Sequence, residues 1–141
     1  MFSKILVAVG GAEDAEETLP VVTGLAKAFK SKVLVVHMRE RVVTAAATME
    51  KETIPQAFRF GEHIASALLE AGVDATVDVR GHRPNQLAEF ILAEANKFGA
   101  ELIIIGGHRS HSMRERLFGD IGRTLSHGSK CPLLMMPSGP Q

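Results

Sequence analysis

Unbroken runs of aliphatic residues constrain the fold of this chain more than any other feature of its sequence. LVAV at 6–9 and LIII at 102–105 contain no polar residue. A strand with one face in solvent alternates apolar and polar residues, whereas a strand buried on both faces can be apolar throughout. These runs therefore predict strands inside a sheet that helices cover on both sides.

Strand-like and helix-like segments alternate along the 141 residues. We expect strands at 4–9, 32–38, 73–79, 101–106 and 131–137, and a short last helix at 120–129. Three longer helices are predicted from apolar residues at helical spacing: Leu19, Val22, Ala26 and Phe29; Ile64, Ala65, Leu68 and Leu69; Leu87, Phe90, Ile91, Ala95 and Phe98. This order predicts an α/β fold, an open five-stranded parallel sheet, in a single domain of residues 1–141.

Local signals refine this assignment. The 73–79 run alternates, as a half-buried edge strand does, whereas 101–106 is the most hydrophobic run and is expected at the centre of the sheet. Gly72 and Gly99 are stop signals for the helices before them, and Pro20 leaves the start of the first helix open. The polar stretch at 39–53 is either a mobile flap beside a site or a poorly ordered connection.

Charge and cysteine content exclude several classes of protein. Sixteen basic and sixteen acidic side chains cancel, which removes the bulk attraction to nucleic acid or to an anionic membrane. The apolar run that starts at Ile5 ends at Gly10, too early for a signal sequence or a membrane span, so we expect a cytoplasmic protein without membrane insertion. The single cysteine, Cys131, excludes an internal disulfide and is expected to be a small buried hydrophobe.

Several stretches resemble the universal stress protein family over essentially the whole chain. They are ILVAVGGAEDAE at the start, VLVVHM with His37 at the family's usual histidine, AELIIIG, and KCPLLMMP at the end; the spacing from Gly119 to Cys131 agrees as well. The resemblance implies a Rossmann-like sheet of strand order 3-2-1-4-5 and a role in stress survival. It also implies homodimers joined through the C-terminal strand.

Many members of this family bind ATP through a glycine motif: Gly, two residues, Gly, nine residues, Gly, then Ser or Thr. That spacing falls on Gly106, Arg109, Gly119 and Asp120 here, so two of the four positions match. Glycines let main-chain amides approach phosphate, and a helix that starts after the last glycine presents unpaired N–H groups from Ile121 onward.

Asp120 replaces a hydroxyl that would donate to phosphate. Two like unit charges about 4 Å apart, at an effective dielectric near 20, repel by about 4 kcal/mol, roughly a thousandfold in affinity. The carboxylate would instead cap the following helix. Arg109 loses the backbone freedom of glycine, and its guanidinium either pairs with Asp120 or binds a phosphate.

The nucleoside end of the expected site also departs from the family. Gly10 stands where ATP-binding members carry an aspartate, so one polar anchor is lost. The resemblance still places Ala8, Val9 and Met38 against an adenine ring through backbone and apolar contact. No cofactor is therefore firmly predicted, and ATP or AMP remains possible.

Other chemistry has weaker support. His108 and His111 lack a nearby carboxylate or cysteine at ligand spacing, which argues against a metal site. His37 either faces the ligand cleft or is a hydrogen-bonded structural histidine. Positive charges outnumber negative charges by two over residues 107–123. This segment either attracts a nucleotide or an acidic partner, or is a solvated arginine-rich loop. A response-regulator receiver domain would need acidic residues where Gly10 and Gly11 stand, so this class is excluded. A dinucleotide-binding domain is excluded as well, because no G-x-G-x-x-G motif follows the first strand.

The preferred functional hypothesis is a noncatalytic stress-response module, a homodimer that acts through its surface or a protein partner, with ATP binding weakened or lost. The alternative is an ATP- or AMP-binding sensor in which Arg109 compensates for Asp120, with or without a bridging divalent cation. A slow ATP hydrolase would need a water-activating base, and the sequence identifies none.

Overall fold

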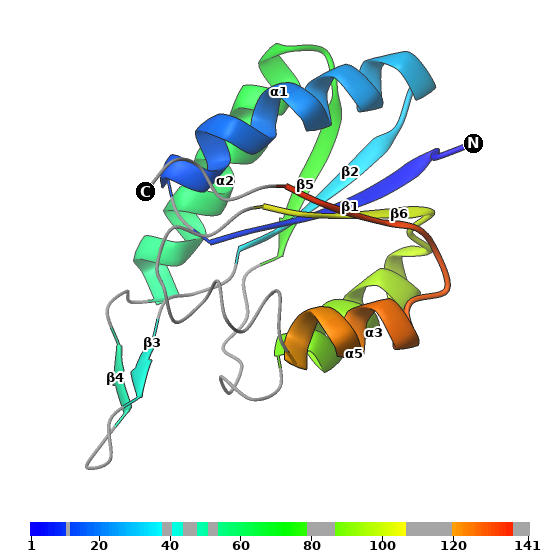
Figure 1. Ribbon diagram of the computed structural model, residues 1–141. Coiled ribbons are helices and arrows are strands. Elements are labelled where there is room, and N and C mark those ends of the chain that lie inside the picture. The colour runs from blue at the N-terminus through cyan, green and yellow to red at the C-terminus, as the bar shows by residue number, and fades with distance from the viewer. Residues whose placement is uncertain are drawn as a thin grey trace.

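A five-stranded parallel sheet forms the centre of the protein, whose computed structural model describes residues 1–10, 12–37, 41–43, 48–50, 54–78, 87–106 and 120–136. The strands are β1 (Lys4–Val9), β2 (Lys32–His37), β5 (Asp74–Asp78), β6 (Leu102–Ile105) and β7 (Leu133–Met135). Their order in the sheet is β5-β2-β1-β6-β7, which confirms the predicted 3-2-1-4-5 arrangement (Figure 1).

The direction in which the chain winds reverses between β1 and β6. From β1 the chain adds β2 and then β5 on one side, whereas β6 and then β7 lie on the other side. The register places Val7 between Val35 of β2 and Ile104 of β6. In open parallel sheets, ligands bind beyond the carboxyl ends of the strands at such a reversal. The ends of β1 and β6 are therefore the expected location of a ligand site.

Helices cover both faces of the sheet. Figure 1 shows α1 (Ala12–Phe29) and α2 (Ile54–Glu70) on one face, and α3 (Leu87–Phe98) and α5 (Asp120–Gly128) on the other. None of the helices within the described ranges combines the length and the apolar composition that crossing a bilayer requires.

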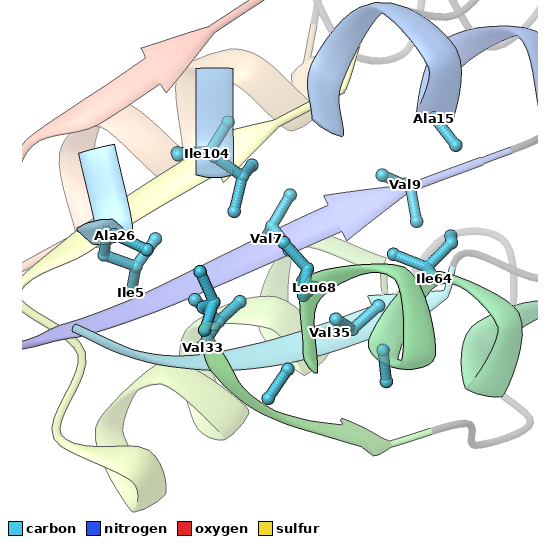
Figure 2. Close-up of a cluster of buried hydrophobic side chains, with 14 of the residues drawn as sticks. Ile5, Val7, Val9, Ala15, Ala26, Val33, Val35, Ile64, Leu68 and Ile104 are labelled. Carbon is cyan, nitrogen blue, oxygen red and sulfur yellow. The ribbon is translucent and has the colours of Figure 1, made fainter. Parts of the chain in front are cut away.

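Alternate residues of β1 enter two separate hydrophobic clusters. Ile5, Val7 and Val9 pack with α1 and α2 residues in the first cluster (Figure 2), whereas Leu6 and Ala8 pack with α3 and α5 residues in the second. All five of these side chains are at most 1% exposed. Burying a large aliphatic side chain stabilises the folded state by about 1.5–3 kcal/mol. The two-sided burial predicted from the aliphatic runs is confirmed.

The structure settles one open point, the start of the first helix, and corrects other local predictions. α1 starts at Ala12, so Pro20 lies inside it. Proline removes one helical hydrogen bond, but core packing of residues on both sides of Pro20, such as Ala15 and Val22, stabilises the continuous helix. The central strand is β1, and β6 lies beside it. Leu69 is 54% exposed, because the core stripe of α2 runs through Ile64, Ala65 and Leu68. Cys131 is only half-buried, against the second cluster.

A small second sheet lies within the stretch predicted to be a flap or a connection. β3 (Arg41–Val43) pairs antiparallel with β4 (Thr48–Glu50), with Val42 opposite Met49. Neither sequence alternative included strands, although the valines and threonine favour extended backbone. The remaining residues of 39–53 lie outside the described ranges, so the choice between flap and connection stays open.

Candidate functional site

The predicted adenine-contact residues lie at the carboxyl end of β1. Ala8 and Val9 are the last two residues paired in the sheet, and Gly10, also buried, follows them. The side chain of Ala8 points into the cluster beneath α3 and α5, and that of Val9 into the cluster beneath α1 and α2. Their side chains therefore serve the two cores, and only their main-chain groups remain to meet a ligand. Met38 lies outside the described residues.

Gly106 follows β6 and is held directly beside the end of β1. Its N–H donates a hydrogen bond to the main-chain oxygen of Ala8 over 2.8 Å. A Cβ atom at this position would lie 3.1 Å from Oγ1 of Thr18, 3.2 Å from the oxygen of Ala8 and 3.4 Å from Cγ1 of Val9. The protein's own packing is therefore sufficient reason for a glycine here. The sequence had suggested only close approach to phosphate, which stays a prediction.

His37 is a hydrogen-bonded structural histidine. The ring is 1% exposed, and Nδ1 lies 3.1 Å from the main-chain oxygen of Val9. Because a carbonyl oxygen can only accept, Nδ1 carries the proton in this bond. The centroid of the ring is 4.6 Å from that of Phe60 on α2, at an interplanar angle of 47°. Of the two sequence alternatives for His37, the structure supports the structural one.

The start of α5 supplies the second half of the expected phosphate motif. Asp120 is the first residue of α5 and Ile121 the second, so the prediction that a helix begins here is confirmed. An acidic residue in a first helical turn interacts favourably with the helix dipole. The position of α5 is set by packing against α3: Leu125 is fully buried, and a Cβ atom on Gly128 would lie 2.7 Å from Cδ1 of Leu92.

The remaining predicted site residues are not among those the structure describes. They are Arg109 and Gly119. His108 and His111, which the sequence did not favour as metal ligands, also lie outside the described residues. His63 and His127 are exposed, and no group of three histidine, cysteine or acidic side chains suited to a metal ion occurs within the described ranges. The structure therefore brings together Ala8, Val9, Gly10 and Gly106, and leaves the assembly of the complete motif as a prediction.

Thr18 lies beside this site and was not among the predicted site residues. It is 1% exposed, and its Oγ1 has no hydrogen-bond partner. The available signal was a polar residue on an otherwise apolar helical stripe, formed by Ala15, Thr18, Val22 and Ala26. The sequence pattern predicts Leu19 in that stripe instead of Thr18.

Comparisons with known proteins agree with this fold. The model of the universal stress protein family matches residues 1–137. The universal stress protein YxiE of Bacillus subtilis (strain 168) is 27% identical over 150 residues, which cover 96% of this chain and 99% of that protein.

Two solved structures are similar over nearly their full length. The universal stress protein from Archaeoglobus fulgidus in complex with dAMP has a TM-score of 0.65 and 21% identity, covering 96% of this chain and 98% of that one. A universal stress protein family protein from Arabidopsis thaliana with AMP bound has a TM-score of 0.59 and 16% identity, covering 97% and 92%. The family match over 1–137, supported by this shared fold, shows that the chain belongs to the universal stress protein family.

Proposed function

We propose that this protein is a noncatalytic stress-response module, a cytoplasmic homodimer whose adenine-nucleotide site binds ATP weakly or not at all. The observation that carries the proposal is that α5 begins at Asp120. The glycine motif of ATP-binding relatives has a serine or threonine at this position. A carboxylate there competes with phosphate for the unpaired N–H groups of the first turn and repels it by about 4 kcal/mol at a separation near 4 Å.

The end of β1 supports the same conclusion at the nucleoside side. Gly10 has no side chain to bond the nucleoside, and the side chains of Ala8 and Val9 are buried in the cores. The main-chain oxygen of Ala8 accepts from Gly106, and that of Val9 accepts from His37. A ligand would have to share these oxygens with protein donors, so the polar contacts at this end are few and weak.

An AMP-binding sensor is the second candidate. Two solved structures with the same fold contain dAMP or AMP, which favours this candidate. At 21% and 16% identity they show that the fold is shared, and the ligand is part of the proposal. A monophosphate also presents less negative charge to Asp120 than a triphosphate. Arg109 would aid either ligand by pairing with Asp120 or with phosphate, and a divalent cation bridging the two anions would act in the same direction.

The homodimer is proposed through the edge strand β7. Leu134 of β7 is 36% exposed, and an apolar edge strand is a template for pairing with another chain. The opposite edge, β5, presents the exposed residues Asp74 and Thr76 instead. Charged and polar residues protect an edge from pairing, so β7 is the edge suited to a second copy.

Titration of the purified protein with ATP and with AMP, each with and without magnesium, tests the proposed nucleotide site. We expect dissociation constants for ATP in the millimolar range or no binding. Micromolar affinity for ATP would overturn the proposal. Micromolar affinity for AMP with weak ATP binding would support the sensor. Steady phosphate release from ATP, lost on substitution of a residue in the site, would contradict the noncatalytic part.

A further inference from the structure

Thr18 occupies a position where an apolar residue would be expected. The stripe of α1 that faces the sheet consists of Ala15, Thr18, Val22 and Ala26, all at most 5% exposed. Valine has nearly the shape of threonine and lacks the hydroxyl. A buried hydroxyl without a partner lowers the stability of the folded state, so packing alone would favour valine at this position.

The hydroxyl of Thr18 does not make a hydrogen bond within its own helix. A buried threonine in a helix commonly donates to the main-chain oxygen four residues earlier, here that of Asp14. Oγ1 of Thr18 has no hydrogen-bond partner. Among the described residues, no other buried side-chain oxygen or nitrogen lacks one. The structure thus gives this buried donor no acceptor within the protein.

The position of this hydroxyl connects it with the candidate site. Oγ1 lies 3.1 Å from the point where a Cβ atom on Gly106 would sit, and Cγ1 of Val9 lies 3.4 Å from the same point. Gly106 follows β6, and Val9 ends β1. The hydroxyl therefore lies between α1 and the carboxyl ends of the two strands at which the winding of the sheet reverses.

We propose that Thr18 is a ligand-binding residue, whose hydroxyl donates a hydrogen bond to a phosphate or ribose oxygen of the bound nucleotide. The inference rests on the proposed function, namely that this site takes adenine nucleotides, however weakly. An oxygen acceptor from the ligand satisfies the buried donor. This contact offsets part of what the site loses at Gly10 and Asp120, and it explains why a hydroxyl is kept on an apolar stripe.

Substitutions at Thr18 with a control on the same helix test this assignment. The variants are Thr18→Val, which removes the hydroxyl, and Thr18→Ser, which keeps it; Thr23→Val is the control at a half-buried position of α1. Thermal unfolding is measured without ligand, and affinities for adenosine and AMP are measured by titration. The same set is repeated in the Asp120→Ser background, where the proposed function predicts tighter binding of phosphate-bearing ligands.

We expect Thr18→Val to raise the unfolding midpoint of the ligand-free protein and to weaken nucleotide binding roughly threefold to tenfold. Thr18→Ser should keep the affinity within about twofold, as should Thr23→Val. A loss with AMP and not with adenosine identifies a phosphate oxygen as the acceptor, whereas an equal loss with both identifies a ribose oxygen.

Two results would overturn the assignment while leaving the proposed function intact. One is unchanged affinity in Thr18→Val when the parent protein binds measurably. The other is a lower midpoint for ligand-free Thr18→Val, because the hydroxyl would then have a partner without ligand, such as a buried water. Absence of nucleotide binding in both the wild type and Asp120→Ser would overturn the nucleotide site itself, and the role of Thr18 with it.

Discussion

His37 donates a hydrogen bond from Nδ1 to the main-chain oxygen of Val9 over 3.1 Å, across the ends of two neighbouring parallel strands. The two residues are also paired in the register of β1 and β2. The side chain of His37 thus adds a hydrogen bond between β1 and β2 at the end of β1, just before Gly10. The contact orders the end of β1 at the candidate site.

Replacing His37 with leucine should destabilise the protein by about 1–3 kcal/mol, because the buried oxygen of Val9 loses its donor while the side-chain volume changes little. Urea unfolding measures the loss as a change in midpoint at an unchanged slope. Phe60→Leu is the control, since it removes the ring contact and keeps the hydrogen bond. A loss no larger than that of the control would show that the hydrogen bond contributes little.

Gly106→Ala should lower the free energy of unfolding by about 1–3 kcal/mol, because the new methyl group would meet Thr18 and the oxygen of Ala8. Adding Thr18→Ala removes one of these contacts, so a double-mutant cycle should show a coupling of about 0.5–3 kcal/mol. Gly128→Ala is the control: the atom it meets is the end of the flexible Leu92 side chain, and its cost should be smaller. Additive effects at Gly106 and Thr18 would contradict the packing that we describe.

Asp120→Asn should strengthen ATP binding, by up to roughly a thousandfold if the carboxylate lies about 4 Å from phosphate. It should also destabilise the fold by about 0.3–1 kcal/mol, through loss of a charge that favours the start of α5. Calorimetric titration and urea unfolding measure the two effects. Glu89→Gln is a matched control, because Glu89 lies in the first turn of α3 and its loss should leave ATP affinity unchanged.

The double change Arg109→Gly with Asp120→Ser restores all four positions of the family's glycine motif. Its ATP affinity should exceed that of Asp120→Ser alone if Arg109 obstructs the turn, and fall below it if Arg109 binds phosphate. No gain over the wild type in either variant would place the defect elsewhere, with Gly10 as the next candidate.

Leu134→Lys should convert the proposed dimer to a monomer, because it places a charge on the apolar edge strand β7. Sedimentation at tens of micromolar protein measures the change. Thr76→Lys places the same charge on the opposite edge, β5, and should leave the dimer intact. A wild-type protein that sediments as a monomer would contradict the proposed assembly outright.

Glu101 provides a test of pH dependence at the amino end of β6. The hydroxyl of Ser3 donates to its carboxylate, the N–H of Ser3 donates to it over 2.8 Å, and together they lower the pKa of Glu101. A lowered pKa in the folded state adds stability at high pH, and this stability is lost as the pH falls through the folded pKa. Ser3→Ala should raise the pKa of Glu101, measured by NMR of its carboxyl carbon, and Ser66→Ala on α2 should not.

The sequence by itself determined the class of the fold and much of its layout. The aliphatic runs predict burial on two faces, as in a sheet between helix layers, and β1 and β6 lie in such a sheet. Gly72 and Gly99, predicted as helix stops, have positive φ angles of 88° and 75°. These features succeed because periodicity and turn chemistry depend on residues close together in the chain. The predicted helix start at 120 succeeded for the same reason.

Only the tertiary structure decided which distant residues meet. His37 bonds to Val9, and Thr18 packs against Gly106. Local pattern cannot reveal these contacts, because each joins groups that become neighbours only when the sheet closes and the helices pack on it. Pro20 is a further example, because local propensity predicts that a proline ends or kinks a helix. Tertiary packing nevertheless keeps α1 continuous through Pro20.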